Sequence, residues 1–295
     1  MVEEQAGLKW GVERRLEFVE FRLFWEDGIR RADLIKTFGV SEPQASKDLT
    51  LYQERAPGNA VYDKVSKRYV AGPNFEPVFL TQEPSEYLVR LRSLGEGLMS
   101  PVETWLGVPP EIDVVLSPAR EVETDCLRSI LKAIREGKSI EVRYQSMNKG
   151  RPDPLWRRIT PHAFGYDGFR WHVRAYCHAT DLFKDFLLPR VIGLRAFDAP
   201  GKRANEDKIW NERFGIVIGP HPELGPNQKA IVAKDYGMKN GTTVLEVRYA
   251  MLFYVLKRLG LLDDPEKKPA RAQHIVVLNK KETKQALQAS DWALG

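Results

Sequence analysis

Polar side chains that could contact nucleic acid recur at helical spacing between residues 41 and 50. A glutamine amide can bond an adenine edge at two points, serine and threonine reach bases or phosphates, and lysine neutralises a phosphate. Three further cations, Lys64, Lys67 and Arg68, follow a Pro-Gly turn and are residue types that neutralise flanking phosphates. Together these residues predict a surface that binds duplex DNA. Its helical part comprises Ser41, Gln44, Ser46, Lys47 and Thr50.

A second group of chemically active side chains lies on a predicted strand over residues 169–177. Alternation along a strand places His172, Arg174 and Tyr176 on one face. Arginine can bind a phosphate or a carboxylate at two points, so this face predicts a concave anion-binding surface. A solvated outer face is the alternative, and the pattern leaves both open.

Catalytic and metal-binding patterns are absent from the sequence. No P-loop, G-x-G-x-x-G or G-x-S-x-G motif occurs. Cys177 and His178 lie near His172, but no C-x-x-C or H-x-x-x-H spacing supports a metal site. We therefore expect a protein that is not an enzyme and that needs no metal or cofactor. A nucleotide-processing enzyme is the weaker hypothesis, because no nucleophile stands out.

The elements that position the first group are those of a helix–turn–helix. Apolar spacing predicts a helix over residues 9–26 and a short second helix, followed by a tight turn. Ser41 can cap a third helix, and Gln44 three residues later completes a Ser-x-x-Gln capping box. A hairpin over residues 60–70 follows, so a winged helix-turn-helix is predicted. An ordinary three-helix subdomain with a solvated polar face is the alternative.

The elements around the second group are one helix and several short strands, which predict a small β-barrel or curled sheet. The helix is expected over residues 120–137, and the strands over 140–146, 156–162, 169–177, 183–190 and 191–197. Strands and helices alternate after residue 214, which predicts a small α/β sandwich. Its strands are expected over 215–219, 243–247 and 274–278, and its helices over 227–236 and 249–261.

The composition is that of a globular protein. The chain has 295 residues, of which 43% are hydrophobic and 29% charged, and its net charge is +5. Apolar runs are far shorter than the roughly 18 residues of a membrane span, and the first residues show no secretion signal. Two cysteines cannot make a disulfide scaffold, so we expect a reducing, cytoplasmic setting without a membrane partner.

The charge is distributed unevenly along the chain. Residues 1–75 are neutral overall, 76–119 carry −5, 120–205 carry +7 and 206–295 carry +3. Prolines cluster in the acidic stretch, and a charge change with clustered prolines marks a domain boundary. The excess of positive charge therefore lies at the centre of the chain and not in its predicted DNA-binding segment.

The central motifs resemble the WYL domain. Tyr144-Gln145-Ser146, an Arg-x-x-x-Pro-His stretch that ends at His162, an Asp-Gly turn at 167–168, and Leu-Pro-Arg-Val around Arg190 occur in the order typical of that family. Trp171-His172-Val173 stands where the family has Trp-Tyr-Leu. The stretch from residue 34 to 49 further resembles WYL repressors encoded beside bacterial phage-defence systems of the BREX and CBASS type.

The resemblance implies an α+β multidomain chain. The expected parts are a winged helix-turn-helix over 1–75, an acidic proline-rich linker with helical segments over 76–119, a WYL domain with an Sm/SH3-like barrel over 120–200, and a dimerising C-terminal extension over 201–295. WYL domains are thought to sense nucleotides or nucleic acid. The implied ligand site comprises Tyr144, Ser146, His162, Trp171, His172, Arg174 and Arg190.

We therefore expect a homodimeric transcriptional repressor that binds an inverted-repeat operator and regulates a phage-defence locus. An anionic nucleotide or nucleic-acid effector in the WYL domain would release it from DNA. The alternative is an RNA- or single-strand-binding accessory protein that acts through the central barrel.

Overall fold

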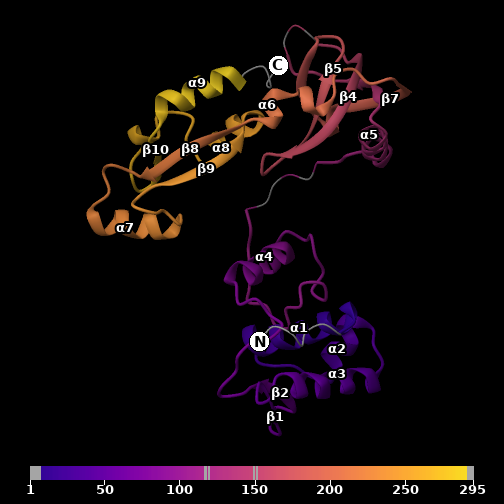
Figure 1. The fold of residues 1–295 in the computed structure, drawn as a ribbon, viewed down its shortest axis with the longest axis vertical. Helices are drawn as coiled ribbons and strands as arrows, with labels where there is room; N and C mark the ends of the chain where they lie inside the picture. Colours follow the sequence, from indigo (N-terminus) through magenta and orange to yellow (C-terminus); the bar gives the residue numbers. More distant parts are fainter. Residues whose placement is uncertain (1–7, 116–117, 119, 149, 151, 291–295) are drawn as a thin grey trace. The chain divides into compact units, whose positions relative to one another are not determined.

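The computed structural model describes residues 8–115, 118, 120–148, 150 and 152–290 (Figure 1). The chain folds as two compact units, Met1–Ser117 and Pro118–Gly295. Among the described residues the first unit has one hydrophobic core and the second has two, and the units are described separately. Among the described residues, no helix combines the length and the apolarity that crossing a bilayer requires.

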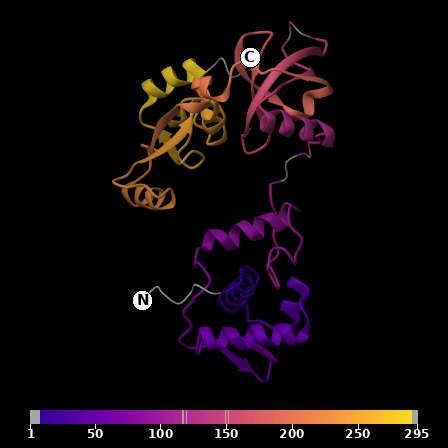
Figure 2. The ribbon, with the colours of Figure 1, turned by 45° about the vertical axis from the view of Figure 1, so that its right-hand side comes forward.

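The first unit has the element order of a winged helix-turn-helix, as predicted. Its elements are α1 (Trp10–Trp25), α2 (Arg31–Phe38), α3 (Glu42–Arg55), β1 (Ala60–Asp63), β2 (Arg68–Ala71) and α4 (Pro84–Gly95). Strands β1 and β2 form an antiparallel hairpin. In both views α1 lies between α4 and α3, and the hairpin lies beyond α3 (Figures 1 and 2).

The turn between α2 and α3 forms as its residue types dictate. Gly39 ends α2 in the left-handed region, with φ 63°, where a residue without Cβ is unstrained. The Ser41 hydroxyl then accepts the Gln44 N–H at 3.3 Å and caps α3. The Gln44 amide donates to Asp48 at 2.9 Å instead of returning to the Ser41 backbone. Half of the predicted capping box therefore forms.

Residues after the hairpin pack into the core of the same unit. The buried Glu20 carboxylate accepts the backbone N–H groups of residues 78, 79 and 80 at 2.6–2.9 Å. The Tyr52 hydroxyl donates to Glu20 at 3.1 Å, and burial beside that carboxylate raises the pKa of Tyr52. Further along, the ring of Trp105 contacts Phe18 and Phe21 edge to face. The acidic stretch thus contributes one helix, α4, and several core side chains to this unit.

A five-stranded antiparallel sheet with one helix opens the second unit. Its elements are α5 (Thr124–Glu136), β3 (Ser139–Tyr144), β4 (Leu155–Tyr166), β5 (Trp171–Cys177), β6 (Leu182–Leu187) and β7 (Val191–Asp198). The strand order is β6-β5-β4-β3-β7, and register shifts bend the β3–β7 and β4–β5 pairs. Edge strands β6 and β7 do not pair within the described residues. The sheet is therefore curled and open there, and the predicted closed barrel is not confirmed.

A smaller three-stranded antiparallel sheet, of order β10-β8-β9, completes the second unit. The elements are α6 (Lys208–Asn211), β8 (Arg213–Pro220), α7 (Pro226–Asp235), β9 (Thr243–Arg248), α8 (Leu252–Arg258), β10 (Ile275–Val277) and α9 (Lys280–Ser290). Ile216, Ile218 and Leu252 lie at the centre of its core. The predicted alternation of strands and helices is confirmed, whereas α9 was not predicted.

Candidate nucleic-acid interface and anion cavity

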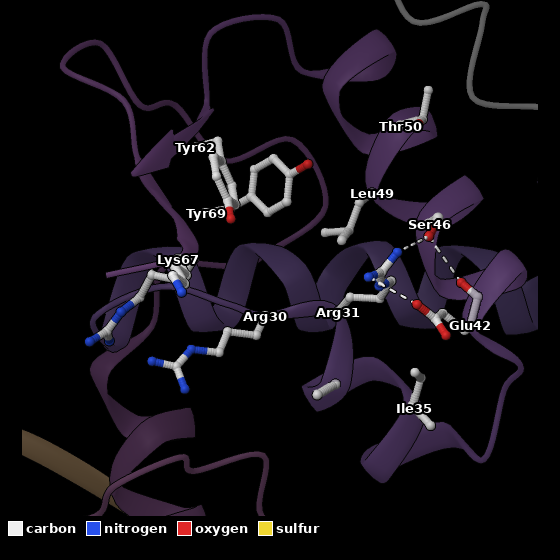
Figure 3. A pocket seen from close by; sticks show the side chains of 12 residues that line it. Arg30, Arg31, Ile35, Glu42, Ser46, Leu49, Thr50, Tyr62, Lys67 and Tyr69 are labelled. Carbon is white, nitrogen blue, oxygen red and sulfur yellow. Dashed lines mark hydrogen bonds and ion pairs between the residues drawn. The ribbon is translucent and has the colours of Figure 1, made fainter. Parts of the chain in front are cut away.

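A groove of about 590 Å³ opens between the start of α2, the outer face of α3 and the hairpin (Figure 3). Its cations come from two elements: Arg30 and Arg31 from the start of α2, and Lys67 and Arg68 from the hairpin. The remaining walls are Ala32, Ile35, Glu42, Ser46, Leu49, Thr50, Tyr62 and Tyr69. Four cations thus face one carboxylate, and the charge of the groove is complementary to a phosphate backbone.

The groove is ordered by weak, exposed contacts that DNA could replace. Arg31 binds the Ser46 hydroxyl at 3.1 Å and the Glu42 carboxylate at 2.9 Å (Figure 3). Both partners of the Arg31–Glu42 ion pair are more than half exposed, so the pair adds little stability. Arg68 lies 3.8 Å from Asp27, and Lys67 has no polar contact within the described part of the chain.

The tip of the hairpin is held by one carboxylate. Asp63 accepts the N–H groups of Val65 and Ser66 at 2.9 and 3.2 Å, and it also accepts the Ser66 hydroxyl at 2.5 Å. These hydrogen bonds, that of the Ser66 hydroxyl foremost, lower the pKa of Asp63. The cap keeps Lys64 and Lys67 at an exposed tip, where they can reach a phosphate.

The structure brings together half of the predicted DNA-binding residues. Ser46, Thr50, Lys67 and Arg68 line the groove. Ser41, Lys47 and Lys64 are exposed nearby but do not line it, and Gln44 is half-buried. Its amide is tied to Asp48, which also binds Arg15 at 2.6 Å.

Sequence reasoning missed Arg30, Arg31 and Tyr62 in this groove. An Arg-Arg pair directly before a helix of the helix–turn–helix is a signal that could have identified the first two.

A second cavity, of about 370 Å³, lies in the second unit between the larger sheet and α8. Its cationic or titratable lining comprises Arg157, Arg170, His172, Lys184 and Arg190, against the carboxylate of Asp185. The other lining residues are Tyr144, Ser146, Met147, Asn148, Phe186, Leu187, Phe253 and Tyr254. Of the predicted ligand residues, four line this cavity: Tyr144, Ser146, His172 and Arg190. We call it the sheet cavity.

Two side chains of the sheet cavity differ in their hydrogen bonding. The Tyr144 hydroxyl accepts the Leu187 N–H at 3.2 Å, which fixes the ring beside Phe186. The Nε of Arg157 is buried and has no hydrogen-bond partner among the described residues. An unsatisfied buried guanidinium nitrogen is costly, and Arg157 also adds a positive charge to the lining of the cavity.

The predicted ligand residue Arg174 does not line the sheet cavity. It is fully buried and binds the Asp207 carboxylate through two nitrogens, at 2.7 and 3.1 Å, and Asp185 through a third at 3.2 Å. The Asp207 carboxylate also accepts a hydrogen bond from Nε2 of His162 at 3.0 Å. At Arg174, the strand face predicted to be either solvated or anion-binding is instead covered by Asp207, which precedes α6 and neutralises the guanidinium, whereas His172 on the same face lines the sheet cavity.

Trp171 also lies outside the sheet cavity. Its ring is 54% exposed and packs against Tyr166 at 4.8 Å. His172, by contrast, is buried, and its two ring nitrogens contact Asp167 at 3.0 Å and the Tyr254 hydroxyl at 3.5 Å.

A chain of buried polar contacts connects the sheet cavity to the C-terminal sheet region. Tyr254, from α8, donates to Asp185 at 3.3 Å, and Asp185 binds Arg174, which binds Asp207. Desolvation raises the pKa of Asp185 despite its contact with Arg174. At Asp207, burial acts in the same upward direction, but the bonds from His162 and Arg174 outweigh it and lower the pKa. Arg174 therefore interacts more strongly with Asp207, which it binds through two nitrogens, than with Asp185, which it binds through one.

The described residues contain no group of three or more His, Cys, Asp or Glu side chains placed to hold a metal ion. Both cysteines in this part of the chain are buried and unpaired.

Comparisons with known proteins agree with this arrangement. Residues 11–93 match the BrxR transcriptional regulator winged helix-turn-helix domain, residues 125–196 the WYL domain, and residues 213–283 the BrxR transcriptional regulator C-terminal dimerization domain.

Three curated relatives match this chain along nearly their whole length. Each carries the name DNA-binding transcriptional repressor CapW. The protein from Stenotrophomonas maltophilia is 42% identical over 95% of this chain and 93% of its own. Those from Escherichia coli (strain KTE188) and Pseudomonas aeruginosa are each 37% identical, over 94% and 96% of this chain and 92% and 94% of their own.

Proposed function

The chain belongs to the family of CapW DNA-binding transcriptional repressors, and from this premise we propose that it is a homodimeric, effector-released repressor of a phage-defence locus. The observation that carries the DNA-binding part is the groove between α2, α3 and the hairpin, where four cations face one carboxylate. In the division we propose, residues 1–75 read DNA with the support of 76–119. Residues 120–200 bind the effector, and residues 201–295 dimerise.

In this proposal α3 enters the major groove. Thr50 and Lys47 are exposed on it and face bases or phosphates, while Lys67 and Arg68 of the hairpin neutralise a flanking phosphate. Ser46 positions Arg31 and becomes free to bond DNA when Arg31 turns to a phosphate. A two-fold dimer then requires an inverted repeat with half-sites one or two helical turns apart.

The test is a binding titration of the full chain on duplex DNA from upstream of its own gene. Lys67→Gln should weaken binding to all sequences and reduce the slope of log K against log salt by about 1 per half-site. Lys9→Gln is the matched control, because Lys9 is exposed in the same unit and does not line the groove. Equal slopes for the two variants would contradict the placement of the hairpin.

The recognition of specific DNA bases by α3 is tested by a second variant. Thr50→Ala should reduce affinity for the specific duplex by about 1 kcal/mol while leaving affinity for a scrambled duplex unchanged. A loss that is the same on both duplexes would show that Thr50 contacts only the backbone.

For the effector, we propose an anion that carries a phosphate and occupies the sheet cavity. Five cationic or titratable side chains face one carboxylate there, and the volume of about 370 Å³ lies within the range of small-molecule sites. Because Tyr254 and Phe253 of α8 form one wall, the effector would contact both the larger sheet and the dimerising region. It releases DNA only if it binds more tightly to a dimer geometry that binds DNA poorly.

A mononucleotide and a short single-stranded oligonucleotide are the probes for this cavity. Each is titrated into the protein–operator complex, with Arg190→Gln as the cavity variant and Arg128→Gln, on the exposed face of α5, as the control. Release that Arg190→Gln abolishes and Arg128→Gln preserves supports the proposal. Release that neither variant alters places the effector elsewhere.

One observation favours a second candidate function. Trp171 and Tyr166 form an exposed aromatic pair, and exposed aromatic rings are typical platforms for stacking single-stranded bases. The chain would then be an RNA- or single-strand-binding accessory protein. Binding of a single-stranded probe that Trp171→Ala abolishes, in a protein that ignores duplex promoter DNA, would favour this alternative.

A further inference from the structure

A separate cavity of about 310 Å³ lies on the opposite face of α2 from the DNA groove. Arg31 and Ile35 of α2 face the groove, whereas Asp33, Lys36 and Thr37 face this cavity. The segment 101–108 forms its other wall. We call it the α2 cavity; neither the matched families nor the proposed function assigns it a role.

The α2 cavity has more positive charge than its own carboxylate can neutralise. Arg22, Arg30, Lys36 and Arg68 line it together with Asp33, and two further carboxylates adjoin it: Asp27 lies 3.8 Å from Arg68, and Glu26 accepts from the wall. Asp33 accepts the Arg30 backbone N–H at 2.7 Å and lies 4.0 Å from the Arg22 guanidinium. Lys36 is exposed and has no polar contact within the described residues. The net charge around this cavity is therefore positive, which favours the binding of an anion.

Two buried donors in the α2 cavity lack an acceptor. The Nε atoms of Arg22 and Arg68 are both inaccessible to solvent and have no hydrogen-bond partner among the described residues. A buried donor without an acceptor is costly and rare. Because solvent does not reach these two nitrogens, a phosphate in the cavity would meet the accessible parts of the two guanidiniums and Lys36, and it would reach the Nε donors only after the arginine side chains turn.

The wall of the α2 cavity is rigidly built. Glu26 accepts the N–H groups of Gly107 and Val108 at 3.2 Å, so its carboxylate fixes the wall. A Cβ on Gly107 would lie 2.2 Å from an Arg22 guanidinium nitrogen, so the glycine is what leaves room for Arg22. The ring of Trp105, two residues earlier, is anchored in the core.

The α2 cavity adjoins the DNA groove, because Arg30 and Arg68 line both. We propose that the α2 cavity binds a backbone phosphate of the operator strand, outside the base pairs that α3 reads. This inference rests on the proposed DNA-binding function and extends its footprint to the segment 101–108. The same chemistry could bind a free phosphate, so the experiment separates the two sources.

The experiment compares the full chain with its Lys36→Gln and Lys9→Gln variants on two duplexes. One duplex extends a full helical turn beyond the inverted repeat on each side, and the other ends at the repeat. On the long duplex, Lys36→Gln should lower the salt slope by about 1 per half-site. On the short duplex, which lacks the flanking phosphate, wild type and Lys36→Gln should have the same slope. Lys9→Gln should match wild type on both.

Arg22→Lys is the second variant, since it keeps the charge and removes the Nε donor. It should weaken binding to the long duplex more than to the short one. Equal slopes for wild type and Lys36→Gln on the long duplex would overturn the proposal while leaving the proposed function intact, because wild type would still bind the repeat. Failure of wild type to bind either duplex would overturn both.

Inorganic phosphate is the probe for the other source. If it raises the melting temperature of wild type but not of Lys36→Gln, while the two share one slope on the long duplex, the cavity binds a free anion and the DNA assignment is wrong. If phosphate leaves both melting temperatures unchanged and the slopes differ as above, the operator backbone is the ligand.

Discussion

The buried ionic contacts around Arg174 predict that two chemically identical substitutions will have very different effects. Asp207 and Asp181 each accept a cation at 2.7 Å, from Arg174 and from Lys202 respectively. The side chains of Asp207 and Arg174 are each 1% exposed, whereas those of Asp181 and Lys202 are 71% and 42% exposed. Asp207→Asn and Asp181→Asn both replace a carboxylate by its neutral isostere, so burial is the main variable.

The expected costs follow from what each change leaves behind. Asp207→Asn removes the charge that faces two Arg174 nitrogens and His162, and breaking one side of a buried ion pair costs about 3–5 kcal/mol. The lower end applies, about 3 kcal/mol, because Asp185 still binds Arg174 at 3.2 Å and the amide keeps one acceptor. Asp181→Asn should leave the free energy of unfolding almost unchanged, as for other exposed pairs.

Urea denaturation followed by hydrogen exchange of peptides from β5 measures the second unit alone. With a slope of about 2 kcal/mol per molar urea, Asp207→Asn should lower the midpoint by about 1.5 M and Asp181→Asn should leave it almost unchanged. If the two midpoints fall by the same amount, burial of the Arg174 pair does not determine its contribution, and the reasoning fails.

Three further results are expected. Burial raises the pKa of Cys126 to about 11 and Cys177 is fully buried, so a thiol reagent at pH 8 should modify both only after unfolding. Burial acts to raise the pKa of Asp167, yet its hydrogen bonds lower it to about 2. Its stabilising contribution is thus present above about pH 4 and lost as the pH falls towards 2, and acid titration of Asp167→Asn should lack that loss. Gly39→Ala should lower the free energy of unfolding by about 1 kcal/mol, because Gly39 has a positive φ but its added Cβ would meet open space. Gly28→Ala should lower it by about 3 kcal/mol, because its Cβ would also lie 2.1 Å from the Tyr69 carbonyl oxygen. Urea titration measures both.

Local signals in the sequence predicted the elements of the first unit well. Helical periodicity, the Ser41 cap and the Gly39 turn act over a few residues, and each is found where the pattern placed it. The capping-box bond predicted for the Gln44 side chain was wrong, because that side chain binds Asp48, which Arg15 of another helix holds in place. A helical pattern shows which residues share a face, but not which of them a neighbouring element engages.

The central site was predictable only in part for the same physical reason. Alternation correctly placed His172 and Arg174 on one face of β5, and both are buried there. Asp207 covers Arg174 on that face from 33 residues further along the chain, and the sequence of the strand itself does not predict this contact. Barrel closure likewise depends on pairing between strands that are distant in sequence. Helix α9 escaped prediction because its sequence, Lys-Lys-Glu-Thr-Lys-Gln, is polar and its buried positions are small residues.

The contact between Glu20 and the backbone of residues 78–80 has a consequence for how such regulators exchange parts. A recombination that joined residues 1–75 to a different sensor would leave the Glu20 carboxylate buried without three of its donors, and the core without Trp105. The part that could be transferred intact to another protein is therefore the whole first unit, up to residue 117. Natural fusions that join this kind of DNA-binding unit to a different ligand-binding domain should therefore have their junctions after the acidic stretch. The segment 101–108 would then stay with the DNA-binding unit.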